Sequence, residues 1–416
     1  MVIMMYLSEL NNVLNGIIKN DALFNTIKTN SKEIEEGDLF LAINSGHNYI
    51  EEAINNGASC VISEKELDNI PNIKIDNSIE ALGKIGNFIR NKYKIPLIAV
   101  TGSVGKTTTK ELISLILGTK YNVLKSQKNH NNNIGLPVTL LNLNEKYDVI
   151  VTELGMNHFD EISYLSKICN PDYAVITNIG SAHIGNLGSK KNIMKAKLEI
   201  LDGMNNGYLL VNKNDKYLKK LKYKNIIKVD NKLLNVKNIK YNDYIEFDID
   251  DTHFIFKSYK HILPDLFIAI KIGLIFGIDL KTMSEVIKEY NGIDGRLNII
   301  KNKYTIIDDS YNSSFESLVG GLNLLKGNEL KFIVLGDMLE LGKFSKMYHK
   351  KINKYLKKIK NKKVLLLGKY TKQIKGIHFD TIEEIIDYLK QNIKDDCIIY
   401  LKGSRKMNLD KIKNTL

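Results

Sequence analysis

Residues 95–109 read Ile-Pro-Leu-Ile-Ala-Val-Thr-Gly-Ser-Val-Gly-Lys-Thr-Thr-Thr. The apolar residues 95–100 predict a strand, and residues 111–117 predict a helix. A short glycine loop is often only a turn. Here, however, a strand, a glycine loop, a lysine, hydroxyl side chains and a helix follow one another in the order of a phosphate-binding loop. The backbone N–H groups and the positive end of such a helix favour an anion.

The spacing within this loop is short. A general P-loop has four residues between its two glycines, whereas this chain has Gly102-x-x-Gly105-Lys106-Thr107, because position 100 is valine. Lys106 can reach the β- and γ-phosphates of a nucleotide, and the Thr107 hydroxyl can bind Mg²⁺. The predicted ATP-binding residues of the loop are Gly102, Ser103, Val104, Gly105, Lys106, Thr107 and Thr108.

Composition indicates a soluble, cytoplasmic protein of several domains. The chain has 416 residues, of which 44% are hydrophobic and 26% charged, and it has no apolar run of the roughly 20 residues that a membrane span needs. Its three cysteines are far apart, without the spacing of a metal or redox motif. The net charge of +13 comes from lysines scattered along the whole chain, which does not favour a nucleic-acid partner.

The alternation of strand and helix patterns predicts an α/β protein of three domains. We expect a small N-terminal α/β domain over residues 1–95 and a central P-loop ATPase-type domain with a parallel sheet over residues 96–296. A Rossmann-like C-terminal domain is expected over residues 297–416. Residues 232–258 read as a β-rich insertion, and residues 261–276 as a buried apolar helix.

Three residues beyond the loop are candidates for the same site. Glu153 ends the strand pattern that follows the P-loop unit, where a carboxylate could ligate Mg²⁺; the alternative is a surface glutamate that caps a turn. His183 follows the next strand pattern, and a neutral imidazole can bind a metal, although a lone loop histidine is more often structural. Lys197 lies in a helix expected over residues 190–204, on a face that it shares with apolar residues. It therefore either snorkels to the surface or is a modified or charge-compensated lysine that faces the nucleotide.

Only three of the 60 basic residues are arginines. Arg296 follows a glycine-rich turn at a predicted domain edge, and Arg405 follows the last strand pattern. A guanidinium is not interchangeable with an ammonium group where a planar fork binds phosphate or carboxylate. Both arginines are therefore candidates for binding a phosphate or a substrate carboxylate, with an ordinary surface position as the alternative.

Taken together, these motifs resemble the Mur ligases, the ATP-dependent enzymes that build the peptidoglycan stem peptide. The resemblance covers essentially the whole chain, and it includes the short P-loop and the 14-residue interval between His183 and Lys197. Further matching stretches are residues 30–32, 37–42, 46–48, 131–137, 153–158, 195–200, 308–312, 336–342 and 402–405. The family plan implies an N-terminal UDP-sugar domain, a central ATPase domain and a C-terminal Rossmann-like domain.

The resemblance is greatest to the branch that joins D-alanyl-D-alanine to UDP-N-acetylmuramoyl-tripeptide through an acyl phosphate. It implies ATP and Mg²⁺ as cofactors, the tripeptide and D-Ala-D-Ala as substrates, and a monomer. Metal ligands would be Thr107, Glu153, His183 and a carbamylated Lys197. Arg296 would contact the γ-phosphate and Asp337 the ribose. Further implied contacts are Asn133 and Asn312 with ATP, Ser31 and His47 with the UDP-substrate, and Arg405 on the dipeptide side.

Some positions depart from the family pattern. Asp265 stands where an adenine-facing asparagine is usual, Ser313 follows Tyr311-Asn312 where alanine is usual, and Lys32 replaces an arginine near the UDP site. Other readings remain open: the ligase that adds the third stem residue, a folylpolyglutamate synthase, and a nucleotide-dependent regulatory module without ligase activity. The acidic motif at residues 153–158 and the N-terminal domain argue against the two enzymes, and the intact set of P-loop and metal residues argues against the regulatory module.

Overall fold

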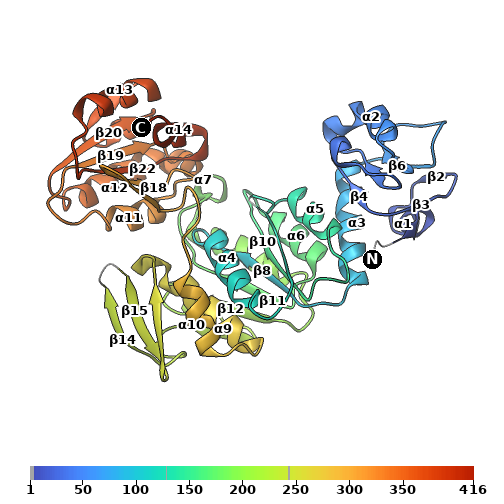
Figure 1. Ribbon diagram of the computed structural model, residues 1–416, viewed down its shortest axis with the longest axis horizontal. Helices are drawn as coiled ribbons and strands as arrows, with labels where there is room; N and C mark the ends of the chain where they lie inside the picture. The colour runs from blue at the N-terminus through green and yellow to red at the C-terminus, as the bar shows by residue number, and fades with distance from the viewer. Residues whose placement is uncertain (1–3, 128, 242–243) are drawn as a thin grey trace.

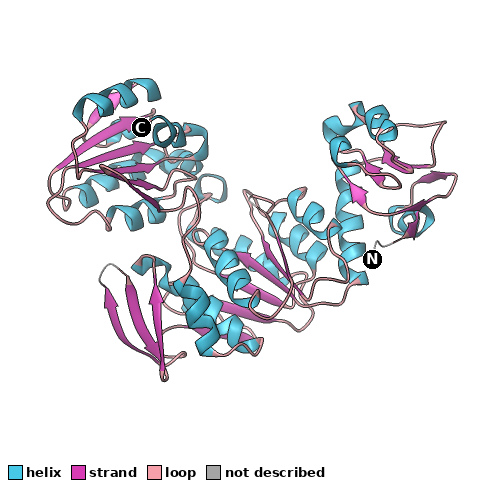
Figure 2. Ribbon diagram, viewed as in Figure 1, coloured by secondary structure: helices cyan, strands magenta, loops and turns pink. Residues whose placement is uncertain are grey.

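The computed structural model describes residues 4–127, 129–241 and 244–416. Figure 1 shows a central α/β unit with an N-terminal unit on one side and a C-terminal unit on the other. Each unit has its own sheet with helices packed against it, as Figure 2 shows. The predicted class, an α/β fold with parallel sheets in three parts, is confirmed.

The N-terminal sheet has five strands in the order β2-β7-β6-β5-β4, and a separate pair, β1 and β3, lies beside it. The strands are β1 (Met5–Tyr6), β2 (Ile17–Lys19), β3 (Leu23–Phe24), β4 (Ile27–Lys28), β5 (Leu39–Leu41), β6 (Cys60–Ser63) and β7 (Asn72–Lys74). The helices are α1 (Leu7–Leu14), α2 (Ile50–Asn55) and α3 (Ser78–Lys92).

Helix α3 belongs structurally to two units. It packs against α1 of the N-terminal unit, and it also packs against α5 (Gly135–Leu141) and α6 (Glu161–Cys169) of the central unit. The side chain of Arg90, near its end, donates hydrogen bonds to the carbonyls of Cys169 and Tyr93 at 2.9 Å and forms an ion pair with Asp172 at 3.0 Å. The third arginine of the chain therefore braces this junction.

The central sheet has six parallel strands in the order β13-β12-β11-β8-β10-β9, and most of their side chains are buried between helix layers. The strands are β8 (Leu97–Thr101), β9 (Val123–Lys125), β10 (Val149–Glu153), β11 (Tyr173–Ile176), β12 (Tyr208–Asn212) and β13 (Ile226–Val229). Strand β8 lies in the middle, paired with β10 on one side and β11 on the other. The loops that follow these three strands therefore meet at one edge.

The predicted β-rich insertion is a three-stranded antiparallel sheet of β14 (Val236–Tyr241), β15 (Ile245–Ile249) and β16 (Thr252–Phe256); residues 242–243 within it lie outside the described residues. The helix predicted at residues 261–276 is α9 (Leu263–Ile275), and α10 (Leu280–Lys288) follows it. Both helices share a buried cluster with Phe247, Phe254 and Phe256 of the insertion.

The C-terminal sheet has the order β17-β18-β22-β19-β20-β21, in which only β17 is antiparallel. Its strands are β17 (Asn298–Lys301), β18 (Thr305–Asp308), β19 (Lys331–Gly336), β20 (Lys362–Leu367), β21 (Ile377–Phe379) and β22 (Ile398–Lys402). Its helices are α11 (Phe315–Leu322), α12 (Ser345–Leu356), α13 (Ile382–Asn392) and α14 (Asp410–Thr415). Among the described residues, no helix is long and apolar enough to cross a membrane.

Two helices differ from the sequence expectations. The P-loop helix α4 begins at Lys106 rather than at residue 111 and ends at Leu117, because the left-handed Gly105 already turns the chain into the helix. The helix expected to run to residue 204 is α8 (Lys190–Leu198), and a 3₁₀ turn, Glu199–Leu201, continues it. Lys197 thus lies in the last turn of α8.

The junction at α3 yields a prediction about stability. Arg90→Met leaves the carbonyls of Cys169 and Tyr93 without a donor, and we expect it to lower the free energy of unfolding by about 2–3 kcal/mol. Denaturant unfolding measures the change. The matched control is Lys84→Met on the same helix, where the exposed pair with Glu80 contributes about 0.5 kcal/mol at most. Equal losses in the two variants would contradict the brace.

Candidate active site

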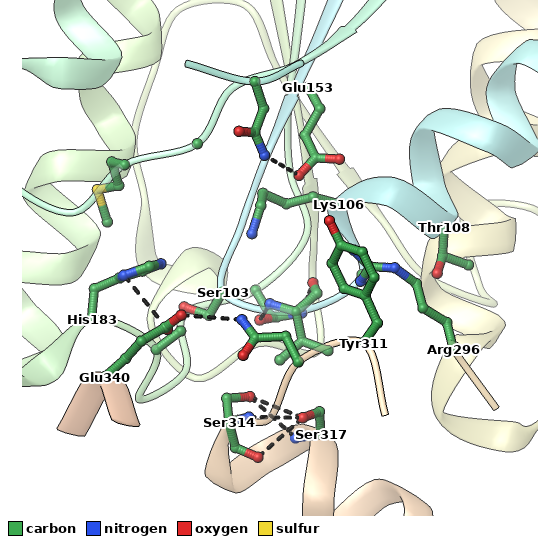
Figure 3. Close-up of a pocket in the computed structure, with 18 of the residues that line it drawn as sticks. Ser103, Lys106, Thr108, Glu153, His183, Arg296, Tyr311, Ser314, Ser317 and Glu340 are labelled. Carbon is green, nitrogen blue, oxygen red and sulfur yellow. Dashed lines mark hydrogen bonds and ion pairs between the residues drawn. The ribbon is translucent and has the colours of Figure 1, made fainter. Parts of the chain in front are cut away.

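A cavity of about 820 Å³ opens where the loops of the central sheet face the C-terminal unit. Both units line it, whereas none of the described residues of the N-terminal unit does. Figure 3 shows the P-loop side chains opposite Glu340, Ser314 and Tyr311 of the C-terminal unit. The lining residues that the sequence predicted are Ser103, Val104, Gly105, Lys106, Thr108, Asn133, Glu153, His183, Arg296 and Asn312.

The P-loop is held by the segment that follows β11. The backbone carbonyl of Asn178 accepts a hydrogen bond from the N–H of Ser103, and its side-chain oxygen accepts one from the N–H of Val104, both at 3.1 Å. Gly105 has φ +85°, and a Cβ atom there would collide with the carboxylate of Asp265. The loop is thus fixed on both sides, and the first turn of α4, whose N–H groups lack intrahelical partners, points at the cavity.

Thr107 and Glu153, the two predicted Mg²⁺ ligands, lie in direct contact. The Thr107 hydroxyl donates a hydrogen bond of 2.7 Å to one carboxylate oxygen of Glu153, and the side chain of Asn131 donates one of 2.9 Å to the other. Glu153 is 3% exposed at the end of β10, so the alternative of a surface turn cap is wrong. Two hard oxygen donors beside the phosphate loop fit the ligand preference of Mg²⁺.

His183 faces the C-terminal unit across the cavity. Its Nδ1 lies 3.5 Å from a carboxylate oxygen of Glu340, and the other oxygen of that carboxylate accepts a hydrogen bond from Asn312. Burial lowers the pKa of His183 to about 4, more than the charge of Glu340 raises it. The imidazole is therefore neutral near pH 7, and its buried Nδ1 has no hydrogen-bond partner among the described residues.

Lys197 is buried beneath this corner of the site. Its residue is 1% exposed, and within the described part of the chain its ammonium group forms no ion pair. Burial lowers the pKa of Lys197 well below its ordinary value, and the nearby charge of Lys106 lowers it further. The snorkelling alternative is wrong. An unpaired buried ammonium is costly, so a neutral or modified amine fits the position.

The C-terminal unit contributes a cluster of aromatic and charged groups. The guanidinium of Arg296 lies 4.3 Å from the ring centre of Tyr311, and both side chains line the cavity (Figure 3). Behind them the buried Lys402 forms an ion pair of 2.6 Å with Asp309, whose carboxylate also accepts a hydrogen bond from Tyr400. Tyr311 thus holds Arg296 in the cavity lining, whereas the charge of Lys402 is balanced by Asp309.

Two of the three departures from the family pattern, Asp265 and Ser313, line this cavity. Asp265 is buried against the P-loop glycine, and burial raises its pKa well above the ordinary value. Ser313 is 2% exposed, and its hydroxyl has no partner within the described ranges. Both residues line the space available to a nucleotide. Their effect on the contact with the adenine base stays a prediction.

Seven predicted site residues do not line this cavity: Gly102 and Thr107 of the P-loop, the buried Lys197, and four residues of the N- and C-terminal units. Asp337 accepts the backbone N–H groups of Tyr370 and Thr371 in the C-terminal core, and Arg405 pairs with Asp410 at the surface. In the N-terminal unit, the Ser31 hydroxyl donates to Glu52, and His47 lies in a 3₁₀ turn with Nδ1 near the Asn44 carbonyl. Their proposed ligand contacts stay predictions. Gly102 and Thr107 support the loop without lining the cavity.

Sequence reasoning did not single out Glu340 or Asn178. Glu340 lies within the stretch 336–342 that carries the family resemblance, and Asn178 follows directly on the strand pattern 173–177. A polar residue at the carboxyl end of a parallel strand is the signal that could have found them.

Comparison with known proteins agrees with this geometry. A family model described as "Mur ligase middle domain" matches residues 100–275, and one described as "Mur ligase, glutamate ligase domain" matches residues 295–405. The chain belongs to the Mur ligase family. A Bacillus subtilis protein named UDP-N-acetylmuramoyl-tripeptide--D-alanyl-D-alanine ligase is 32% identical to it, over 94% of this chain and 92% of that protein.

Solved Mur ligase structures share the fold. A crystal structure of MurF from Acinetobacter baumannii superposes with a TM-score of 0.89 at 26% identity, covering 99% of this chain and 98% of that one. A MurF ligase from Thermotoga maritima, solved in complex with ADP, has a TM-score of 0.83 at 27% identity, covering 94% and 96%. The similarity therefore includes all three units of this Mur ligase.

The packing of the P-loop yields a second prediction. Gly105→Ala forces a left-handed backbone onto alanine and drives its Cβ into Asp265, so we expect at least a tenfold loss of ADP affinity, on the order of 1–2 kcal/mol from strain alone. Calorimetric titration measures it. In the control, Gly277→Ala, φ is +67° but the nearest atom to the new Cβ is Lys120 Nζ at 3.5 Å. The control should bind ADP like the parent protein, and unchanged ADP binding by Gly105→Ala would refute the prediction.

Proposed function

We propose that this Mur ligase joins D-alanyl-D-alanine to UDP-N-acetylmuramoyl-tripeptide at the expense of ATP. The observation that carries the proposal is the shared cavity, where the P-loop, Glu153 and His183 meet the C-terminal unit, with Thr107 bonded to Glu153 and the buried Lys197 near His183. Relatives bearing the name of that ligase, at 32% and 33% identity over 94% and 99% of the chain, support it.

The chemistry requires activation of a carboxylate, because the oxide it would have to expel is a poor leaving group. In the first step a carboxylate oxygen of the tripeptide attacks the γ-phosphorus of ATP, the bond to ADP breaks, and an acyl phosphate forms. In the second step the amine of D-Ala-D-Ala attacks the carbonyl carbon, phosphate leaves, and the amine loses a proton. Positioning and charge stabilisation supply most of the catalysis in such phosphoryl transfers.

Residues of the central and C-terminal units have separate roles in this scheme. Lys106 and the N–H groups at the start of α4 hold the phosphates, with Asn133 and Asn312 as further nucleotide contacts. Arg296, steadied over the ring of Tyr311, contacts the γ-phosphate. For Asp337 to reach the ribose, its hydrogen bonds to the segment after β20 would have to change.

Magnesium fits the donors present. Thr107 and Glu153 offer adjacent oxygens, and the unpartnered Nδ1 of His183 and a carbamylated Lys197 would hold a second ion. When bound, Mg²⁺ neutralises the charge that develops on the phosphoryl oxygens. Carbamylation joins the Lys197 nitrogen to the carbon of CO₂ and releases one proton. It replaces a buried cation with an anion, whose oxygens would be ligands for the second Mg²⁺.

The family resemblance supports the remaining assignments of this proposal. Ser31 and His47 contact the UDP-substrate in the N-terminal unit, and Arg405 lies on the dipeptide side. The domain limits proposed are 1–95, 96–296 and 297–416, although α3 spans the first of these boundaries in its packing. The protein works as a monomer in the cytoplasm, where ATP and nucleotide-activated sugar peptides are available.

The decisive assay follows phosphate release from ATP. With UDP-MurNAc-tripeptide and D-Ala-D-Ala both present we expect steady release, and omission of either substrate should abolish multiple turnover. Release that depends on a free amino acid instead of the dipeptide would favour the neighbouring ligase of the family. Release with a folate substrate would favour a folylpolyglutamate synthase, and nucleotide binding without release would favour a regulatory module.

Lys197 has a test of its own. Lys197→Ala should lower kcat by roughly 100-fold, because it removes a carbamate ligand that would hold the second Mg²⁺ beside the phosphoryl group. The matched control is Lys195→Ala, an exposed position on the same helix, which should keep full activity. With ¹³C-bicarbonate, the parent protein and the control should show a carbamate carbon resonance that Lys197→Ala lacks. Full activity of Lys197→Ala, or a carbamate signal that persists in it, would exclude the role.

A further inference from the structure

Glu316, near the start of α11, reaches from the C-terminal unit into the central unit. One carboxylate oxygen accepts hydrogen bonds from the backbone N–H of Ser181 at 2.8 Å and from its hydroxyl at 2.7 Å. The other forms an ion pair of 2.8 Å with Lys190 on α8. A single carboxylate therefore satisfies three donors that belong to the opposite unit.

Ser181, which Glu316 binds, is preceded in the chain by Gly180, and Gly180 is hydrogen-bonded to the P-loop. The backbone N–H of Gly180 donates a hydrogen bond of 2.8 Å to the Ser103 hydroxyl, and the Ser103 N–H donates to the carbonyl of Asn178. The contacts are tight, because a Cβ on Gly180 would lie 2.9 Å from the Glu316 carboxylate and 3.0 Å from the Ser103 Cβ. Any displacement of residues 178–181 therefore shifts the hydrogen-bond partners of Ser103 in the P-loop.

The charge state of the Glu316 carboxylate also favours this contact. Burial alone would raise the pKa of Glu316, but its bonds to Lys190 and Ser181 outweigh burial and leave the pKa below its ordinary value. The carboxylate is therefore charged at neutral pH, and hydrogen bonds to a charged acceptor are the strong ones. The same interface includes a second close approach, where Gly185 packs against Gly342.

We propose that Glu316 is a positioning residue that couples docking of the C-terminal unit to the shape of the phosphate loop. When the two units are in contact, Glu316 fixes Ser181, Gly180 presents its N–H to Ser103, and the P-loop takes the conformation that binds phosphate. When they separate, Ser181 loses two hydrogen bonds, Lys190 loses its ion pair, and the loop is less ordered. The inference rests on the proposed nucleotide site. It adds that the conformation of this site depends on Glu316 of the C-terminal unit.

The expected effect follows from the number of bonds lost. Hydrogen bonds to a charged group are each worth roughly a 10- to 100-fold change in an equilibrium constant. Only part of that loss reaches the loop, so we expect Glu316→Ala to weaken ADP binding about tenfold. Glu316→Gln keeps an oxygen that can accept from Ser181 but loses the ion pair, so its loss should be smaller.

The experiment is ADP titration by calorimetry on the full chain. The variants are Glu316→Ala, Glu316→Gln, Ser103→Ala and the double variant Glu316→Ala/Ser103→Ala. The control is Glu383→Ala, an exposed acidic position at the start of α13, which should bind ADP like the parent protein. If Glu316 acts through Ser103, its removal should matter much less once Ser103 is alanine, so the two losses should not multiply.

Each outcome decides something. Unchanged ADP affinity in Glu316→Ala, or losses that multiply in the double variant, would overturn the coupling and leave Glu316 as a docking contact alone. Thermal unfolding of each variant shows whether it is folded, and Glu316→Gln serves if the alanine variant is not. Failure of the parent protein to bind ADP would count against the proposed nucleotide site itself. Absence of dipeptide-dependent phosphate release in a parent protein that binds ADP would count against the ligase reaction and not against the coupling.

Discussion

The pairing of β8 with β10 on one side and β11 on the other is the constraint on which the rest of the site depends. Parallel strands end at the same edge, so the P-loop, Glu153 and the segment that contains Asn178 and His183 are delivered together. Their chemistry then follows from short links across that edge. Thr107 reaches Glu153, and Asn178 reaches the backbone of the loop, without any long side chain having to span the sheet.

Most of the central site could be predicted because its signals are local in the sequence. The P-loop is read from consecutive residues, and Glu153 and His183 from their places at strand ends. Lys197 is read from helical periodicity, and its burial in the last turn of α8 agrees with the apolar face. The family resemblance added the pairing of these residues into metal sites, which periodicity alone does not contain.

What could not be predicted depends on contacts between distant segments. Glu316 and Ser181 are 135 residues apart, and Glu340 meets His183 across the same boundary. No local pattern encodes such a contact. The same reason applies to Asp337, because the hydrogen bonds that its carboxylate accepts from the backbone N–H groups of Tyr370 and Thr371 are not readable from the sequence around it. Among the three arginines, Arg90 proved structural, because its partners come from α6 and the residues just after it.

Helix α3 couples the stability of the N-terminal unit to that of the central unit. The helix packs against α1 of the N-terminal unit and against α5 and α6 of the central unit. If the N-terminal unit melted together with this helix, the faces of α5 and α6 against which the helix packs would be exposed to water. We therefore expect those two units to unfold as a single cooperative block. The first domain boundary of the chain is then not an energetic boundary.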